Sequence, residues 1–399
     1  MAASPLDSAL LSPLFTDADI SQLFTDAAML NAMVTVEVAL VKANESCGLI
    51  PASKAEQIAD LLRVGGLDQS AIGKGTSESG VPVVALVEGL RAQLSEDLRS
   101  YLHVGPSSQD IMDLALIVQI KAAVELMVVR LDRLIVALER LAAAHRDTLM
   151  VGRTRGQQAT PTTFGLKVTS WLLPLKRHAT RLIELKSRLL VVQLGGAGGT
   201  LGGIAPQSDG SHPSGRHPGL AITESVAERL DLGVPPAPWH AQRDGLAEFA
   251  SWLSLVSGSL GKIGLDVMLM SQNEVGELSE GGGPGTGRGG SSSMPQKANP
   301  VRSEALVTLA RFNAGLVSTM HHALLQEHER GGPGWMSEWM ALPQMICTTG
   351  GSLARAGELL DGLVVNTDRM RGNLDMTNGL VLAEAAMVAL AAHIPKPEA

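Results

Sequence analysis

The chain has 399 residues, of which 45% are hydrophobic but only 3% aromatic. This composition favours close-packed helices over sandwiches or barrels, because sheets rely on β-branched and aromatic residues. The chain carries 32 basic and 40 acidic residues and has no long basic run, which argues against a nucleic-acid partner held mainly by phosphate contacts. At roughly 100–200 residues per domain, the length indicates two or three domains.

Targeting and redox signals indicate the compartment. The N-terminal segment lacks the basic start and apolar stretch of a signal peptide. The longest uncharged stretch, residues 189–208, contains six glycines and is a poor membrane span. Cys47 and Cys347 are too far apart for a CxxC zinc site or a disulfide scaffold. We therefore expect a soluble cytoplasmic protein with no membrane partner.

Long helical patterns follow in chain order. Between Ser107 and Val151 there is no Gly or Pro, and apolar residues recur every three or four positions, which predicts one helix of ~60 Å. Similar patterns cover residues 164–193, interrupted by Pro174, then 244–278 and 300–330. Helices that are apolar on several faces are buried on several sides. The sequence therefore predicts an all-α bundle of very long helices, completed by other subunits.

Three Gly-rich loops separate these helices, at residues 195–203, 209–219 and 281–290. None matches the phosphate-binding pattern GxxxxGK[ST], and no strand pattern precedes them. We interpret them as connectors, but the third is followed by the most specific motif of the chain.

That motif is GSSSMPQKANP at residues 290–300. It resembles the signature GSSxMPxKxNP of the fumarase/aspartase superfamily and matches it at every fixed position. The resemblance extends to HVGPSSQD at residues 103–110, which opens the first long helix, and to GRTRGQQATP at residues 152–161.

Longer stretches narrow the resemblance. They are PWHAQRDGLAEFA at residues 238–250, QEHER ending at Arg330, and NLDMTNGLVLAEA at residues 373–385. Within the superfamily they resemble the 3-carboxy-cis,cis-muconate cycloisomerase family. The resemblance implies closure of a tricarboxylate to a γ-lactone in the β-ketoadipate pathway of aromatic catabolism, without a cofactor. It also implies a homotetramer in which each active site collects three motif regions from three subunits.

The resemblance also suggests roles for the signature loop. Ser291 is expected to transfer the proton, with Ser292 as its less favoured substitute. Lys297 and Asn299 are expected to stabilise the aci-carboxylate, which carries two negative charges on one group. A serine of ordinary pKa is a poor base, so the loop must desolvate and polarise it.

Ser107 and Ser108 lie where a helix N-terminus is expected. Serine is a favourable N-cap, and free N–H groups at a helix N-terminus also bind carboxylates, so both roles are predicted. By their position in the second region, Thr154 and Gln157 are expected to bind substrate.

Position 155 departs from the superfamily pattern, since many members have a histidine after the threonine and this chain has Arg155. Arginine stays protonated and cannot shuttle a proton. A reaction whose attacking group is an ionised carboxylate needs no such proton, and an arginine can hold that group bidentately. Arg155 therefore favours lactone formation, although a rearranged site that uses His240 would undo this inference.

Other charged side chains have weaker signals. His240 and Arg330 are expected to contact substrate, whereas His145 and His178 are expected on the surface. No HExxH pair is present, so no metal is expected. Two further arginines, Arg153 and Arg243, could instead be structural ion-pair partners.

The predicted organisation is an N-terminal helical domain (1–104), a central long-helix bundle (105–371) and a shortened C-terminal domain (372–399), where two prolines prevent further helix. Three alternative functions stay open. They are a 3-sulfomuconate cycloisomerase, another superfamily lyase such as adenylosuccinate lyase, and a non-catalytic scaffold.

Overall fold

The computed structural model describes residues 4–204, 217–281, 289–291, 293–294 and 296–395. Most of the second and third Gly-rich loops, and Ser292, lie outside this range. The N-terminal helices are α1 (Ser12–Phe15), α2 (Ala18–Ser21), α3 (Asp26–Ser46), α4 (Lys54–Leu61), α5 (Gln69–Ser79), α6 (Val83–Ala92) and α7 (Glu96–Arg99). The later helices are α8 (Ser108–Ala144), α9 (Phe164–Leu189), α10 (Pro218–Leu230), α11 (Asp244–Met270), α12 (Val301–His322), α13 (Pro333–Gly362), α14 (Thr367–Asp375) and α15 (Ala383–Leu390).

Short strands and 3₁₀ turns complete the chain. The strands are β1 (Leu149–Thr154), β2 (Gln157–Thr163), β3 (Leu278–Ser279) and β4 (Val364–Val365), which form two antiparallel pairs, β1–β2 and β3–β4. The 3₁₀ turns are η1 (Pro5–Asp7), η2 (Gln22–Phe24), η3 (Val64–Gly66), η4 (Gly202–Ile204) and η5 (Leu380–Leu382).

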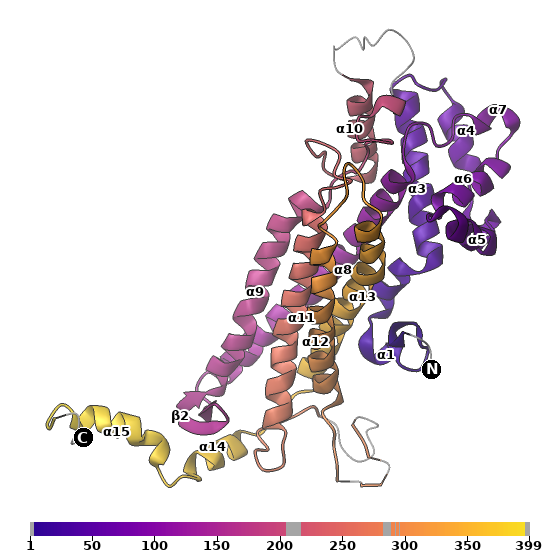
Figure 1. The fold of residues 1–399 in the computed structure, drawn as a ribbon. Coiled ribbons are helices and arrows are strands. Elements are labelled where there is room, and N and C mark those ends of the chain that lie inside the picture. The colour runs from indigo at the N-terminus through magenta and orange to yellow at the C-terminus, as the bar shows by residue number, and fades with distance from the viewer. Residues whose placement is uncertain (1–3, 205–216, 282–288, 292, 295, 396–399) are drawn as a thin grey trace.

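The long helices lie side by side in an elongated bundle, with α3–α7 beside one end and α14–α15 at the other (Figure 1). Helix α11 packs against α9, α12 and α13. It is long and apolar enough to cross a membrane, but its central position marks it as a core helix. The predicted long-helix, all-α architecture is confirmed.

Glycines on α11 bring α12 unusually close. A Cβ at Gly261 would meet the Cβ of Ala310 at 2.5 Å, and one at Gly264 would meet the carbonyl oxygen of Ser303 at 2.7 Å. The first turn of α12 therefore rests directly on the backbone of α11. A residue larger than glycine at position 261 or 264 would push α12 away.

Four helices end earlier than their apolar patterns predict, including α9, which ends at Leu189 rather than at residue 193. Helix α8 stops at Ala144 instead of Val151, because residues 149–154 pair as strand β1 with β2 and bury Met150 and Val151. Helix α11 ends at Met270, and Leu278 joins the short β3–β4 pair. Helix α12 ends at His322, well before Arg330. In each case an apolar side chain is buried by a turn or strand that periodicity cannot distinguish from a helix.

The buried apolar residues form two large clusters. One runs through α8, α9, α11, α12 and α13. The other joins the N-terminal helices to the start of α8, to α10 and to Trp335 of α13. The start of α8, which Ser107 caps, thus lies at the junction of the two clusters.

Candidate active site

The Ser107 end of α8 is organised by one buried carboxylate, Asp110. Ser107 caps the helix in a capping box, in which its hydroxyl accepts the Asp110 N–H while Asp110 accepts the Ser107 N–H at 2.7 Å. The Ser107 hydroxyl also lies 2.9 Å from Asp110 Oδ2. The predicted N-cap role is confirmed.

Asp110 also binds the first Gly-rich loop and His240. Its Oδ1 accepts the N–H of Gly195 at 3.0 Å and lies 2.7 Å from His240 Nε2, and its Oδ2 accepts the N–H of Gly196 at 2.9 Å. Both Asp110 and His240 are buried. A Cβ at Gly195 would lie 2.7 Å from His240 Cε1, so only glycine fits there. This fully buried carboxylate fixes the orientation of the His240 ring.

Arg330 reaches the same Gly-rich loop from the segment that follows α12. One terminal nitrogen, Nη2, donates to the carbonyl of Gly196 at 2.9 Å. Its Nε is buried and has no hydrogen-bond partner in the described part of the chain. Arg330 thus has an unused N–H donor and lies near His240 and the N-terminus of α8, so this end of the bundle can bind an anionic group.

A buried ion network lies beneath this end. Arg243 forms two-point ion pairs with Asp113 and with Glu338, its closest contact to Asp113 being 2.7 Å, and its guanidinium lies 4.9 Å from the Trp239 ring centre. Burial raises the pKa of Glu338, although the Arg243 guanidinium opposes this. The alternative structural role of Arg243 is confirmed, and its network holds the His240 segment against α8 and α13.

The signature loop lies at the other end of α11, just before α12. Asn299 N–H donates to Gly289 O at 2.8 Å, and Gly290 bridges to Ala298, so the loop is closed at its base. Ser291 Oγ accepts the N–H of Met294 at 3.2 Å. Ser291 and Asn299 are half-buried and Lys297 is exposed.

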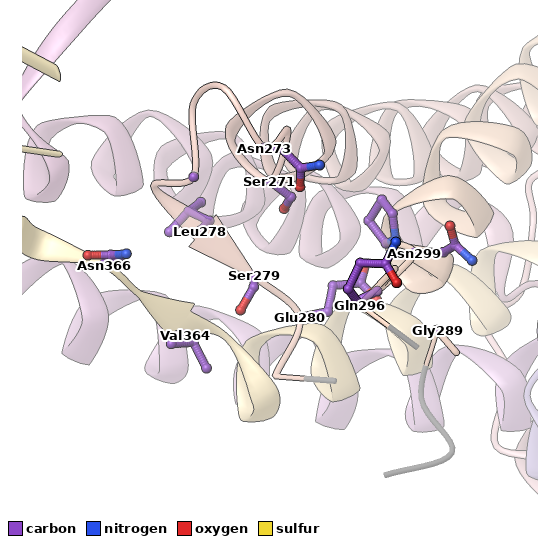
Figure 2. A pocket seen from close by; sticks show the side chains of 13 residues that line it. Ser271, Asn273, Leu278, Ser279, Glu280, Gly289, Gln296, Asn299, Val364 and Asn366 are labelled. Carbon is purple, nitrogen blue, oxygen red and sulfur yellow. The ribbon is translucent and has the colours of Figure 1, made fainter. Parts of the chain in front are cut away.

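A cavity of about 360 Å³ lies beside this loop (Figure 2). Its lining includes Asn299 and Gln296 of the loop, Glu280, and further neutral polar side chains. The described lining holds one carboxylate and no cation, so this cavity does not match a substrate with several negative charges.

The remaining predicted residues lie at the tip of the β1–β2 hairpin. Arg155 and Gly156 form its two-residue turn with φ of 52° and 80°, and Thr154 pairs with Gln157. All three predicted residues, Thr154, Arg155 and Gln157, are exposed. Two left-handed residues are typical of the type I′ turn that suits a twisted hairpin.

Arg153 connects this hairpin to the segment that follows α11. It forms a two-point ion pair with buried Glu277, at 2.9 and 2.7 Å, and Asn373 donates to the same carboxylate at 2.7 Å. The alternative structural role of Arg153 is confirmed.

Within one chain, therefore, the predicted residues form two groups at opposite ends of the bundle (Figure 1). The upper group, beside α10 in that view, comprises Ser107, Ser108, His240 and Arg330. The lower group comprises Ser291, Lys297, Asn299 and the hairpin tip. The 37 residues of α8 separate Ser107 from the hairpin by about 55 Å.

Sequence reasoning missed Asp110, Glu277 and Glu280. Asp110 lies inside the HVGPSSQD motif, but its partners are up to 130 positions away and no periodicity indicates them. His178, expected on the surface, is instead buried, with Nε2 2.8 Å from Ser259 Oγ and Nδ1 accepting from Arg181. His178 lies on the face of α9 that contacts α11. Because the surrounding segment is rich in charged residues, the sequence does not reveal that this face is buried.

The fold and the signature loop define a lyase, and the chain belongs to the lyase family, whose model matches residues 15–314. It is 42% identical over 98% of its length to a Pseudomonas aeruginosa protein named 3-carboxy-cis,cis-muconate cycloisomerase and covers 83% of that protein. The crystal structure of 3-carboxy-cis,cis-muconate lactonizing enzyme from Pseudomonas putida superposes with a TM-score of 0.89 at 38% identity, covering 98% of this chain and 85% of that one. A Streptomyces davaonensis protein named nitrosuccinate lyase is 38% identical over the full chain, which covers 83% of that relative.

Proposed function

We propose that this protein is a cycloisomerase that converts 3-carboxy-cis,cis-muconate to a γ-carboxymuconolactone in protocatechuate catabolism. The observation that carries the proposal is 42% identity over nearly the whole chain to a protein of that name, together with a signature loop complete at its fixed positions. The reaction is an isomerisation. One carboxylate oxygen bonds to one carbon of a diene double bond as its π bond breaks, the other carbon of that bond takes up a proton that solvent replaces, and no atom of the substrate is lost.

The lower group would perform the proton transfer. Ser291 would handle the proton at the carbon beside a carboxylate, while Ser292 stays its less favoured substitute. Lys297 and Asn299 would stabilise the negative charge that develops on that carboxylate. The two backbone hydrogen bonds that Ser293 and Met294 donate to Ser291 Oγ support this, because they stabilise the negative charge left on the oxygen once the hydroxyl has given its proton to carbon.

The upper group would bind the other carboxylates. The backbone N–H groups of Ser108 and Gln109, in the first turn of α8, would attract an anion. Arg330, with its unpartnered Nε, would bind a second carboxylate beside them. His240, held by Asp110, would contact the bound substrate.

The hairpin tip would complete the site. Arg155, with Thr154 and Gln157, would orient the attacking carboxylate, since a guanidinium holds a carboxylate bidentately without exchanging a proton.

The separation of the two groups supports a homotetramer with shared sites. A substrate a few ångströms long cannot contact both ends of a helix of about 55 Å, so different subunits would have to supply them. Large apolar side chains are exposed along the bundle, including Val129, Leu166, Leu173, Ile183, Leu255, Leu265, Leu269 and Phe312. Apolar surface of this extent is typical of subunit interfaces. We place the assembled protein in the cytoplasm, as its unpaired cysteines suggest.

The first test follows the ultraviolet absorbance of 3-carboxy-cis,cis-muconate with purified protein. Lactonisation breaks the conjugated diene, so we expect a rapid decrease in absorbance. The 3-sulfo analogue and nitrosuccinate are the comparison substrates. A flat trace with the carboxy compound from a tetrameric protein, with turnover of either comparison, would contradict the proposed substrate.

A second test addresses the shared site. His240→Ala inactivates the upper group and Ser291→Ala the lower group. If sites are shared, mixing the two inactive proteins under conditions that exchange subunits restores activity, because some sites then receive both intact groups. Mixed tetramers that stay inactive would contradict the shared site.

A further inference from the structure

We infer that Glu280 is a positioning residue for the signature loop, acting as the N-terminal cap of α12. This inference rests on the proposed function and adds a residue to its machinery. Glu280 lies before the described part of the loop and lines the cavity beside Asn299 (Figure 2).

Helix α12 has no local cap. Its N-cap position is Pro300, which makes no side-chain hydrogen bond to the first turn. The first N–H groups of a helix need acceptors when they are shielded from water. Here the acceptors come from a residue about twenty positions earlier.

The Glu280 carboxylate fills this role with both oxygens. Oε1 accepts the N–H of Ser303 at 2.7 Å, and Oε2 accepts the N–H of Arg302 at 3.1 Å. The Glu280 side chain is buried, and its negative charge lies at the positive end of the α12 dipole. Such charge-assisted bonds in a shielded site are stronger than those of an ordinary serine cap.

The surroundings leave little freedom on either side of this contact. The next residue, Gly281, has φ of 67°, and a Cβ there would lie 2.2 Å from the carbonyl oxygen of Gly362. On the other side, Ser303 rests against Gly264 of α11. The first turn of α12 is thus held between α11 and Glu280, and Asn299 and Lys297 immediately precede it. A shift of that turn would displace the two groups proposed to stabilise the transition state.

The test compares Glu280→Gln with Glu358→Gln. Glutamine keeps the size of Glu280 but loses its charge and turns an amide NH₂ toward an N–H donor. Glu358 is the matched control, because it pairs with the same Arg302 through its side chain, at 2.9 Å, and leaves the backbone amides untouched. We expect kcat of Glu280→Gln to fall roughly 10- to 100-fold with little change in KM, and Glu358→Gln to behave like the parent protein.

Hydrogen exchange supplies a readout that does not need the substrate. Exchange at the Arg302 and Ser303 amides should accelerate in Glu280→Gln and stay unchanged in Glu358→Gln. Unchanged exchange and unchanged kcat in folded Glu280→Gln would overturn the inference. If the parent protein fails to convert the muconate, the proposed function fails, while faster exchange would still support the cap.

If Glu280→Gln fails to fold, Glu280→Asp tests the cap instead. The shorter side chain keeps the charge but reaches only one of the two amides, so we expect a smaller loss of kcat and faster exchange at one amide. Parent-like kcat and parent-like exchange in Glu280→Asp would overturn the inference.

Discussion

The two ends of the bundle hold their predicted site residues in opposite ways. At the upper end, one buried carboxylate, Asp110, makes hydrogen bonds to the helix cap, to the first Gly-rich loop and to His240. At the lower end, Lys297 and the hairpin tip are exposed, and Ser291 is half-buried. The upper end is already organised within one chain, whereas the lower end lacks the covering that a desolvated proton transfer requires.

This difference indicates a division of roles, in which the upper end binds the substrate and the lower end carries out the proton transfer. A pre-organised anion site spends little of its binding free energy on ordering itself. Exposed chemical groups, by contrast, cannot act until another surface excludes water from them. Three substitutions, in order of decreasing effect, test that division, and a fourth tests the stability of the bundle between the two ends.

Ser291→Ala removes the hydroxyl proposed to transfer the proton. We expect kcat to fall about 10³-fold with unchanged assembly, since general acid–base groups contribute on this scale. Steady-state kinetics and light scattering measure the two quantities. Ser293→Ala, at a variable position of the same signature, is the control and should keep its activity. Retention of most activity by Ser291→Ala would assign the proton transfer elsewhere, with Ser292 the next residue to test.

Asp110→Asn tests the organised end. An amide cannot accept from all the donors that surround it, so at least one donor is left unpaired. We expect kcat/KM to fall about 10²-fold, chiefly through KM, and the free energy of unfolding to fall by roughly 2–4 kcal/mol. Asp147→Asn, whose carboxylate is exposed and pairs with Arg146, is the control. An unchanged KM would show that the Asp110 cluster does not serve the site.

Arg155→Lys tests the hairpin tip. Lysine keeps the charge but cannot hold a carboxylate bidentately, so we expect KM to rise about 10-fold. The melting temperature should not change, because Arg155 is exposed. Arg146→Lys, an exposed arginine paired with Asp147, is the control. Equal KM values for the Arg155→Lys protein and the parent would exclude Arg155 from substrate contact.

His178→Gln affects stability alone, far from either end. Burial, aided by Arg181 and Arg177, lowers the pKa of His178 from 6.5 to about 4. The unfolded chain therefore takes up this proton first, and stability that is complete above pH 6.5 is lost as the pH falls toward 4. We expect the parent to lose roughly 2 kcal/mol between pH 7 and pH 5 through this group, and the variant much less. Parallel denaturation profiles for the two proteins would contradict this.

Local sequence patterns predicted some of these features well. The Ser107 cap depends on neighbours within one turn of helix, and the structure confirms it. His178 was predicted wrongly, because its burial depends on which face of α9 meets α11, far along the chain. The end of α8 was predicted wrongly, because apolar periodicity does not distinguish the last turns of a helix from the strand of an adjacent hairpin. The site roles of Ser291 and Arg155 stay predictions, which the kinetics of their variants test, and the role of Arg330 also stays a prediction.

The sequence by itself determined the long helices and the lyase family, because helical periodicity and the signature loop are continuous in the chain. Only the tertiary structure decided how these parts meet. It brought Asp110 to His240 across 130 positions and Glu280 to the start of α12 across 23. It also placed the two groups of site residues at opposite ends of the bundle (Figure 1). Hydrogen bonds between distant segments leave no periodic trace in a sequence, since each depends on the packing of every helix between them.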